Sequence, residues 1–278
     1  MKKITRRSFL AAAGLTAAAL ALTACGGSSS STASSTASSA ASSEAASSSA
    51  AAELTTVEAG KLTMATNAAF PPYEMTTDTG AFEGIDVDTA QAIAEKLGLE
   101  LQIDDMDFDA ALLSVQQGKA DIVMAGVTVT DERKAVMDFS DSYATGIQSI
   151  IVPEGSDIAT PDDLAGKKIG TQRGTTGYIY CSDDFGDDAV VAYDDGLTAV
   201  QALNNGQVDA VVIDNAPAKE FVAANPGLVI LDTSYAEEDY AIGMAKGSAL
   251  EDAINATLEE LKADGTLQSI VDKYITAE

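Results

Sequence analysis

The chain contains no histidine, and only two of its 278 residues are cysteines, Cys25 and Cys181. Histidine is the commonest metal ligand and the usual general base near neutral pH. Its absence disfavours a hydrolase, and we expect neither a metal nor a cofactor. Because Cys25 has another role, described below, we expect disulfides to contribute nothing to stability. Cys181 is expected to be a small, buried hydrophobic residue.

Positive charge is also scarce. The chain has 16 Lys and Arg residues against 43 Asp and Glu residues, which gives a formal net charge of −27. Such a chain repels a phosphate backbone, so nucleic acid is excluded as a partner. We interpret the acidity mainly as a source of solubility.

The N-terminal apolar run, residues 9–22, is shorter than the roughly 20 residues that a transmembrane helix needs. Four basic residues precede it, so residues 1–24 are predicted to be a signal peptide. The sequence Leu-Thr-Ala-Cys25 resembles the lipobox of bacterial lipoproteins, whose cysteine carries diacylglycerol. We expect a palmitate-type lipid anchor on an extracytoplasmic or periplasmic protein. Residues 5–10 also resemble a twin-arginine signal, so two export routes remain open.

Residues 25–53 comprise Cys25 followed by a segment consisting almost entirely of Ser, Ala, Thr and Gly. This composition offers almost nothing to bury and predicts a disordered linker between the lipid and a folded domain.

In the rest of the chain, short apolar runs typical of strands alternate with segments whose apolar residues have helical spacing. In the first half, strands are expected at 61–66, 99–103 and 120–125, and helices at 86–97 and 107–117. In the second half, strands are expected at 168–172, 189–193 and 208–213, and helices from 174 and at 197–204. Each half therefore predicts an α/β lobe with a parallel sheet and helices on both faces.

Residues 107–126 and 195–214 align without gaps. Each segment has a capping Asp, an apolar helix face, a Gly and a strand that starts at Asp121 or Asp209. The alignment places Gly126 and Asp214 at the same point, the carboxyl end of a parallel strand. Ligands of open α/β sheets bind at such ends.

Several motifs resemble the polar amino acid family of bacterial periplasmic binding proteins, solute-binding family 3: residues 66–74 (TNAAFPPYE), 84–90, 126–134 (GVTVTDERK), 136–143, 174–177 and 261–267. The resemblance covers residues 57–275 and implies the two-lobed type II fold with a mostly parallel sheet in each lobe. Lobe 1 is expected at 57–145 plus 242–278, and lobe 2 at 146–241. Hinge crossings are expected near 143–148 and 239–243.

A free amino acid offers a carboxylate, an ammonium group and a side chain, and each needs a partner once it is desolvated. By the resemblance, Arg133 binds the carboxylate, Asp214 binds the ammonium group, and Phe70 and Phe108 enclose the aliphatic part. The implied ligand-binding residues are Asn67, Phe70, Phe108, Gly126, Thr128, Arg133, Gln172, Thr175, Thr176 and Asp214.

Each of these residues also has a purely structural interpretation. Arg133 can be a surface residue, Phe70 and Phe108 can belong to a core, and Asp214 can cap a following helix. Asn67 stands where many family members with cationic ligands carry Asp, which favours a neutral polar ligand. Glu74 can restore a negative charge, so basic amino acids remain open.

The resemblance implies a monomer that closes on its amino acid and delivers it to the permease and ATPase subunits of an ABC importer. The same fold also carries arogenate and cyclohexadienyl dehydratases, and ligand-sensing modules. The lack of a nucleophile paired with a base favours binding over catalysis.

Overall fold

The computed structural model describes residues 54–275. The predicted signal peptide, Cys25 and the whole predicted linker lie outside these residues, as do residues 276–278. None of the helices in the described part combines the length and apolarity that crossing a bilayer requires.

The first sheet is built from segments at both ends of the described chain. Its strand order is β5 (Glu100–Asp105), β1 (Lys61–Thr66), β6 (Ile122–Val123), β14 (Gly243–Ala245) and β7 (Met137–Phe139). The helices associated with it are α1 (Ile85–Leu97), α2 (Phe108–Gln116), α3 (Asp131–Val136), α7 (Glu251–Ala263) and α8 (Thr266–Tyr274).

Strand β1 is buried on both faces because its side chains alternate between two cores. Leu62 and Met64 belong to a cluster with apolar residues of α1 and α7. Ala65 points to the opposite cluster, which contains Phe108 and Val115 of α2. Helix α1 ends, as predicted, at a glycine in the left-handed conformation, Gly98 with φ of 71°.

The second sheet repeats this arrangement. Its order is β10 (Val190–Tyr193), β9 (Ile169–Gln172), β11 (Ala210–Asp214), β8 (Ala144–Pro153) and β12 (Leu228–Ile230), with β13 (Ala236–Tyr240) also paired to β8. Its helices are α4 (Thr176–Phe185), α5 (Gly196–Asn204) and α6 (Asn215–Ala224), and its 3₁₀ turns are Pro161–Leu164 and Asp187–Ala189. Cys181 of α4 is fully buried in this lobe, as expected.

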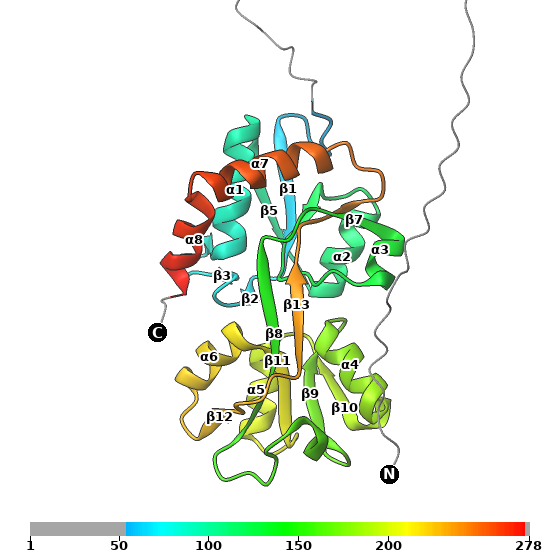
Figure 1. Cartoon of the computed structure of the whole chain (residues 1–278), viewed down its shortest axis with the longest axis vertical. Helices are drawn as coiled ribbons and strands as arrows, with labels where there is room; N and C mark the ends of the chain where they lie inside the picture. The colour runs from blue at the N-terminus through cyan, green and yellow to red at the C-terminus, as the bar shows by residue number, and fades with distance from the viewer. Residues whose placement is uncertain (1–53, 276–278) are drawn as a thin grey trace, which may run out of the picture. The chain divides into compact units, whose positions relative to one another are not determined.

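Two extended segments connect the sheets. Strand β8 carries the chain into the second sheet, and β13 returns it beside β8 in antiparallel register (Figure 1). They run through the residues predicted as hinge crossings. A small sheet of β2 (Ala69–Phe70), β3 (Glu74–Thr76) and β4 (Phe82–Glu83) belongs to the first lobe.

The predicted fold class is confirmed, and three details differ. Both sheets are mixed, because β14 and β7 in one and β8, β12 and β13 in the other pair antiparallel. The strand expected at 120–125 is only two residues long, β6. Asp107 occupies the N-cap position of α2 without a side-chain hydrogen bond, whereas Asp195 accepts one from the Thr198 N–H at 2.6 Å.

The aligned segments share one structural device. The Asp121 carboxylate accepts hydrogen bonds from the backbone N–H groups of Val57 (2.7 Å) and Thr63 (2.8 Å). Asp209, its counterpart in the second lobe, accepts one from the N–H of Lys168 at 2.7 Å. In each lobe an aspartate thus ties the start of one strand to the backbone at the neighbouring strand.

This comparison predicts unequal losses of stability. Asp121→Ala leaves two N–H groups without partners, one of them buried, and should lower the free energy of unfolding by about 1–3 kcal/mol. Asp209→Ala frees a single N–H at an exposed position and serves as the matched control, with a smaller loss. Urea titration followed by circular dichroism measures both, and an equal loss would contradict the assignment.

Candidate functional site

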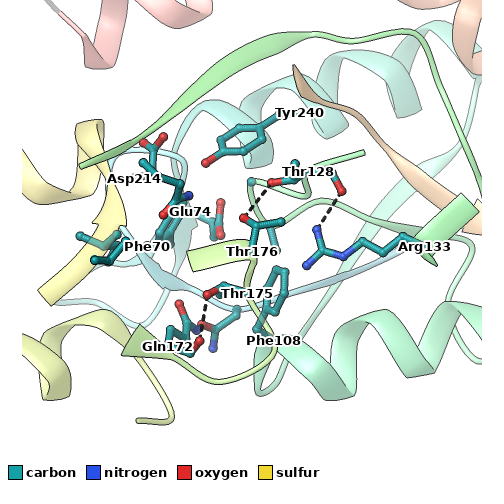
Figure 2. A pocket seen from close by; sticks show the side chains of 16 residues that line it. Phe70, Glu74, Phe108, Thr128, Arg133, Gln172, Thr175, Thr176, Asp214 and Tyr240 are labelled. Atoms are coloured by element: carbon teal, nitrogen blue, oxygen red, sulfur yellow. Dashed lines mark hydrogen bonds between the residues drawn. The ribbon is translucent and has the colours of Figure 1, made fainter. Parts of the chain in front are cut away.

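One pocket lies where the two lobes meet. Figure 2 shows the side chains around it, which come from both lobes and from the two connecting strands. The structure brings all ten predicted residues to its wall. The lining residues are Asn67, Phe70, Glu74, Phe108, Ala125, Gly126, Thr128, Arg133, Gln148, Gln172, Thr175, Thr176, Val212, Ile213, Asp214 and Tyr240.

Arg133 is held inside this pocket rather than on the surface. Helix α3 begins at Thr130, whose hydroxyl caps the Arg133 N–H at 3.2 Å and fixes the turn that carries the guanidinium. The guanidinium donates to the carbonyl of Thr128 (2.8 Å) and to that of Gly174 (3.2 Å), so it bridges the two lobes. Burial lowers the pKa of Arg133, while Glu238 acts in the opposite direction.

The N-terminus of α4 faces the same region. Gly174 has φ of 75°, a conformation that favours glycine, and it turns the chain from β9 into the helix. Thr175 caps α4 by accepting from the Tyr178 N–H and donates its hydroxyl to the Gln172 carbonyl at 2.8 Å. The unpaired N–H groups of this first turn and the helix dipole suit an anion such as a carboxylate.

Asp214 caps a helix, as the structural interpretation of the sequence expects, and it also lies at the pocket wall. It ends β11 and caps α6 by accepting from the Ala216 N–H at 2.9 Å, and it also accepts from the Ile147 N–H at 2.8 Å. It nevertheless lines the pocket. Burial raises its pKa to about 6, against the lowering effect of these donors.

Gly126, at the equivalent point of the first lobe, has φ of 53° and donates its N–H to Asp86 at 2.9 Å. A β-carbon on Gly126 would lie 2.9 Å from the Phe70 ring, so a side chain here would push into the pocket wall. Asp86 also accepts from the Tyr143 hydroxyl at 2.7 Å. These contacts hold the backbone of residue 126 against the cleft.

The two predicted aromatic walls have different partners. The Phe70 ring stacks on Tyr73 with centroids 5.7 Å apart. The Phe108 ring lies under the Arg133 guanidinium, 5.3 Å from its central carbon, a cation–π arrangement. The aromatic ring of Phe108 therefore helps to orient the cation.

Direct contacts between the lobes hold the cleft nearly closed. Gln172 donates to the Asn67 side chain at 2.8 Å, and the hydroxyls of Thr128 and Thr176 lie 3.4 Å apart. The space inside the pocket that is open to the centre of a water molecule is only about 20 Å³. A ligand of amino acid size therefore requires the lobes to separate before it can enter.

Glu74 was outside the predicted set, although the sequence suggested it as a source of negative charge. Its side chain is fully buried at the pocket, and neither carboxylate oxygen has a hydrogen-bond donor within residues 54–275. Burial, followed by the neighbouring charge of Asp86, raises the pKa of Glu74 well above its ordinary value.

Sequence reasoning also missed three residues of the connecting strands: Gln148, Glu238 and Tyr240. Glu238 accepts from the Thr128 hydroxyl (3.1 Å) and from the Gln148 amide (2.9 Å). Gln148 and Tyr240 lie in the two segments predicted as hinges. The burial of alternate residues in β13 indicates that a hinge strand can also line the cleft.

Two lobes with a charged pocket between them define a solute-binding protein, and the comparisons agree. Residues 62–277 match the bacterial extracellular solute-binding proteins, family 3. The L-cystine-binding protein TcyJ of Escherichia coli K12 is 33% identical over 80% of this chain and 85% of its own length. An ancestral arginine-binding protein bound to arginine is 42% identical, with a TM-score of 0.74, over 78% of this chain and 98% of that one. An ancestral arginine-binding protein bound to glutamine is 41% identical, with a TM-score of 0.75, over 78% of this chain and 99% of that one.

The chain belongs to the extracellular solute-binding proteins of family 3. It is a binding protein and not an enzyme, as expected, since the relatives compared are named as binding proteins.

Proposed function

We propose that the protein binds a free basic amino acid outside the cytoplasm and delivers it to the permease and ATPase subunits of an ABC importer. The observation that carries this choice is Glu74, a fully buried carboxyl group at the wall of the pocket that no donor of the described residues, 54–275, contacts. A buried anion without a partner is costly, and a cationic ligand supplies that partner.

The titratable groups around the pocket support the same ligand class. Three lining residues are ionisable: Arg133 is a cation, and Asp214 and Glu74 become negative when they lose their protons. An amino acid with a neutral side chain contacts Arg133 with its carboxylate and Asp214 with its ammonium group. It then has no charged group left to contact Glu74. A basic amino acid carries one further positive charge and matches the full set.

Each ligand group then has a separate partner. The carboxylate lies at Arg133 and the N-terminal turn of α4, the ammonium group at Asp214, Thr128 and the Gly126 carbonyl, and the side chain between Phe70 and Phe108 toward Glu74, Asn67 and Gln172. Asn67 alone favours a neutral side chain. The ancestral arginine-binding proteins were solved bound to arginine and to glutamine. These structures support the proposal that a pocket of this family can accept a basic or a neutral side chain.

Binding couples to closure because these partners belong to different lobes. We divide the folded chain into lobe 1, residues 57–145 plus 242–278, and lobe 2, residues 146–241, joined by β8 and β13. The membership of the two sheets supports this division. A ligand that contacts both lobes binds the closed form more tightly than the open one, which shifts the equilibrium toward closure.

A thermal-shift screen of the amino acids, with ornithine, citrulline and cystine, tests the ligand class. A ligand at 100 times its Kd stabilises the protein by about 2.7 kcal/mol, so it should raise the Tm visibly. We expect arginine, lysine or ornithine to give the largest shift and glutamine a smaller one. A largest shift with glutamate or with a purely aliphatic amino acid would contradict the proposal.

The carboxylate contact predicts a large effect of Arg133. Arg133→Ala removes the buried cation and should weaken ligand binding by about 2–5 kcal/mol, measured by calorimetry. Arg133→Lys should recover only part, because an ammonium group cannot make two parallel hydrogen bonds. Arg173→Ala, at an exposed arginine paired with Asp194, is the matched control and should bind normally. Unchanged affinity in Arg133→Ala would remove this residue from the site.

The N-terminal segment completes the proposal. Residues 1–24 direct export, Cys25 carries the lipid, and residues 25–53 tether the lobes to the outer face of the membrane. No further protein chain is needed for the pocket, so we take the monomer as the functional unit.

The lipid anchor predicts a change of location. Cys25→Ser removes the thiol that accepts the lipid, so the protein should appear in the soluble extracellular or periplasmic fraction. Cys181→Ala, at the buried cysteine, is the control and should stay with the membrane fraction. Fractionation and immunoblotting measure both, and membrane retention of Cys25→Ser would contradict lipidation at this residue.

A further inference from the structure

Glu74 and Asp86 form a buried pair of carboxyl groups beneath the pocket. Both side chains are completely shielded from solvent. None of the ion pairs within residues 54–275 includes either of them. Two neighbouring buried carboxylates without a counter-ion cannot both stay ionised at low cost, so one of them holds a proton.

The two members of the pair differ in their hydrogen bonds. Asp86 accepts from the Gly126 N–H and from the Tyr143 hydroxyl, and both bonds favour its ionised form. Glu74 has no donor. Burial raises the pKa of Asp86 only to about 6, while the pKa of Glu74 rises well above its ordinary value. The proton therefore belongs to Glu74, with Asp86 as the neighbouring acceptor.

Among residues 54–275, no cation competes for Glu74. The charged groups that act on it are the carboxylates Asp86 of α1, Asp105 of β5 and Asp214 of β11. Asp105 is engaged with the Ala68 N–H at 2.8 Å. Across the cleft, the Arg133 guanidinium points at two backbone carbonyls.

The remaining titratable groups near the pair are tyrosine hydroxyls, from Tyr73, Tyr143 and Tyr240. Burial raises the pKa of each well above its ordinary value, so all three stay neutral across the physiological range. Of the pair, Glu74 is the member that lines the pocket and holds a proton, so its charge is the one that a cationic ligand would change.

We propose that Glu74 exchanges its proton for the cationic side chain of the ligand, so that binding of a basic amino acid releases one proton while binding of a neutral amino acid releases none from this pair. This inference rests on the proposed function, because it requires a cationic side chain at Glu74. It assigns Glu74 as the residue that makes ligand preference depend on pH.

The sign of the pH effect follows from the two states of Glu74. Without ligand it holds its proton up to a raised pKa, and a neighbouring guanidinium lowers that pKa in the complex. Between the two values, each pH unit should tighten arginine binding by up to about tenfold, since one proton leaves. Above the raised pKa the affinity should become constant.

Glutamine separates this effect from that of the other groups in the pocket. It shares the α-carboxylate and α-ammonium group with arginine, so both ligands should contact Asp214 in the same way. Asp214 has a pKa of about 6, so its own protonation should affect the binding of both ligands equally at lower pH. The difference between arginine and glutamine therefore reports Glu74.

Isothermal titration calorimetry measures the proton directly. Purified protein is titrated with L-arginine and with L-glutamine from pH 6.5 to 8.5, in phosphate and in Tris, which differ in ionisation enthalpy. We expect the observed enthalpy for arginine to depend on the buffer with a slope of about one released proton in the linked pH range. For glutamine the slope should be near zero.

Two variants and one control variant test which residue releases the proton. Glu74→Gln should weaken arginine binding, abolish the buffer dependence and leave an affinity that no longer changes over this pH range. Glu237→Gln, on the exposed side of β13, is the matched control and should behave as the wild type. Tyr143→Phe keeps Glu74 but removes a donor from Asp86, and should move the pH range of proton release upward.

The outcomes separate the two proposals. If no basic amino acid binds at any pH, the proposed ligand class fails. If arginine binds the wild type with no buffer dependence and with constant affinity from pH 6.5 to 8.5, the ligand class stands and proton exchange is overturned. If Glu74→Gln still releases the proton, the assignment to Glu74 is overturned.

Discussion

A charge that is removed from water needs a partner, and this constraint organises the cleft. The Arg133 guanidinium finds its partners in both lobes, because it donates to the carbonyls of Thr128 and Gly174. The Asp214 carboxylate accepts hydrogen bonds from two backbone N–H groups. Within residues 54–275, Glu74 receives no hydrogen bond from a donor group. The cleft therefore has partners for the charges of Arg133 and Asp214 but no donor for Glu74, which is where ligand identity can be selected.

The two-lobed architecture places these groups. Each lobe ends its central parallel strands at the cleft, so Gly126 and Asp214 reach it from equivalent positions. The antiparallel strands β8 and β13 connect the sheets, and β13 brings Glu238 to the Thr128 hydroxyl. A hinge strand that also contacts the site couples the approach of the lobes to the orientation of the polar groups between them.

Proton exchange at Glu74 would resolve a conflict that a buried anion creates. An ionised Glu74 would destabilise the protein without ligand, and a permanently neutral residue would not attract a cation. A group that is protonated when alone and ionised beside a ligand avoids both costs. Asp86 makes this possible, because its bonds from Gly126 and Tyr143 keep the second charge of the pair in place.

The sequence by itself determined the α/β class and most of the elements, because hydrophobic period and glycine stops are local properties. The ten predicted residues of the pocket wall followed from motifs that resemble a known family. The sequence did not determine the mixed sheets or the short β6, which depend on returning strands such as β14 that pair over long separations. Nor did it identify Glu238 or Tyr240 as site residues. The partner of a buried carboxylate is set by segments that meet in three dimensions. Only the tertiary structure therefore decided that Asp214 accepts backbone N–H groups and that Glu74 accepts none from residues 54–275.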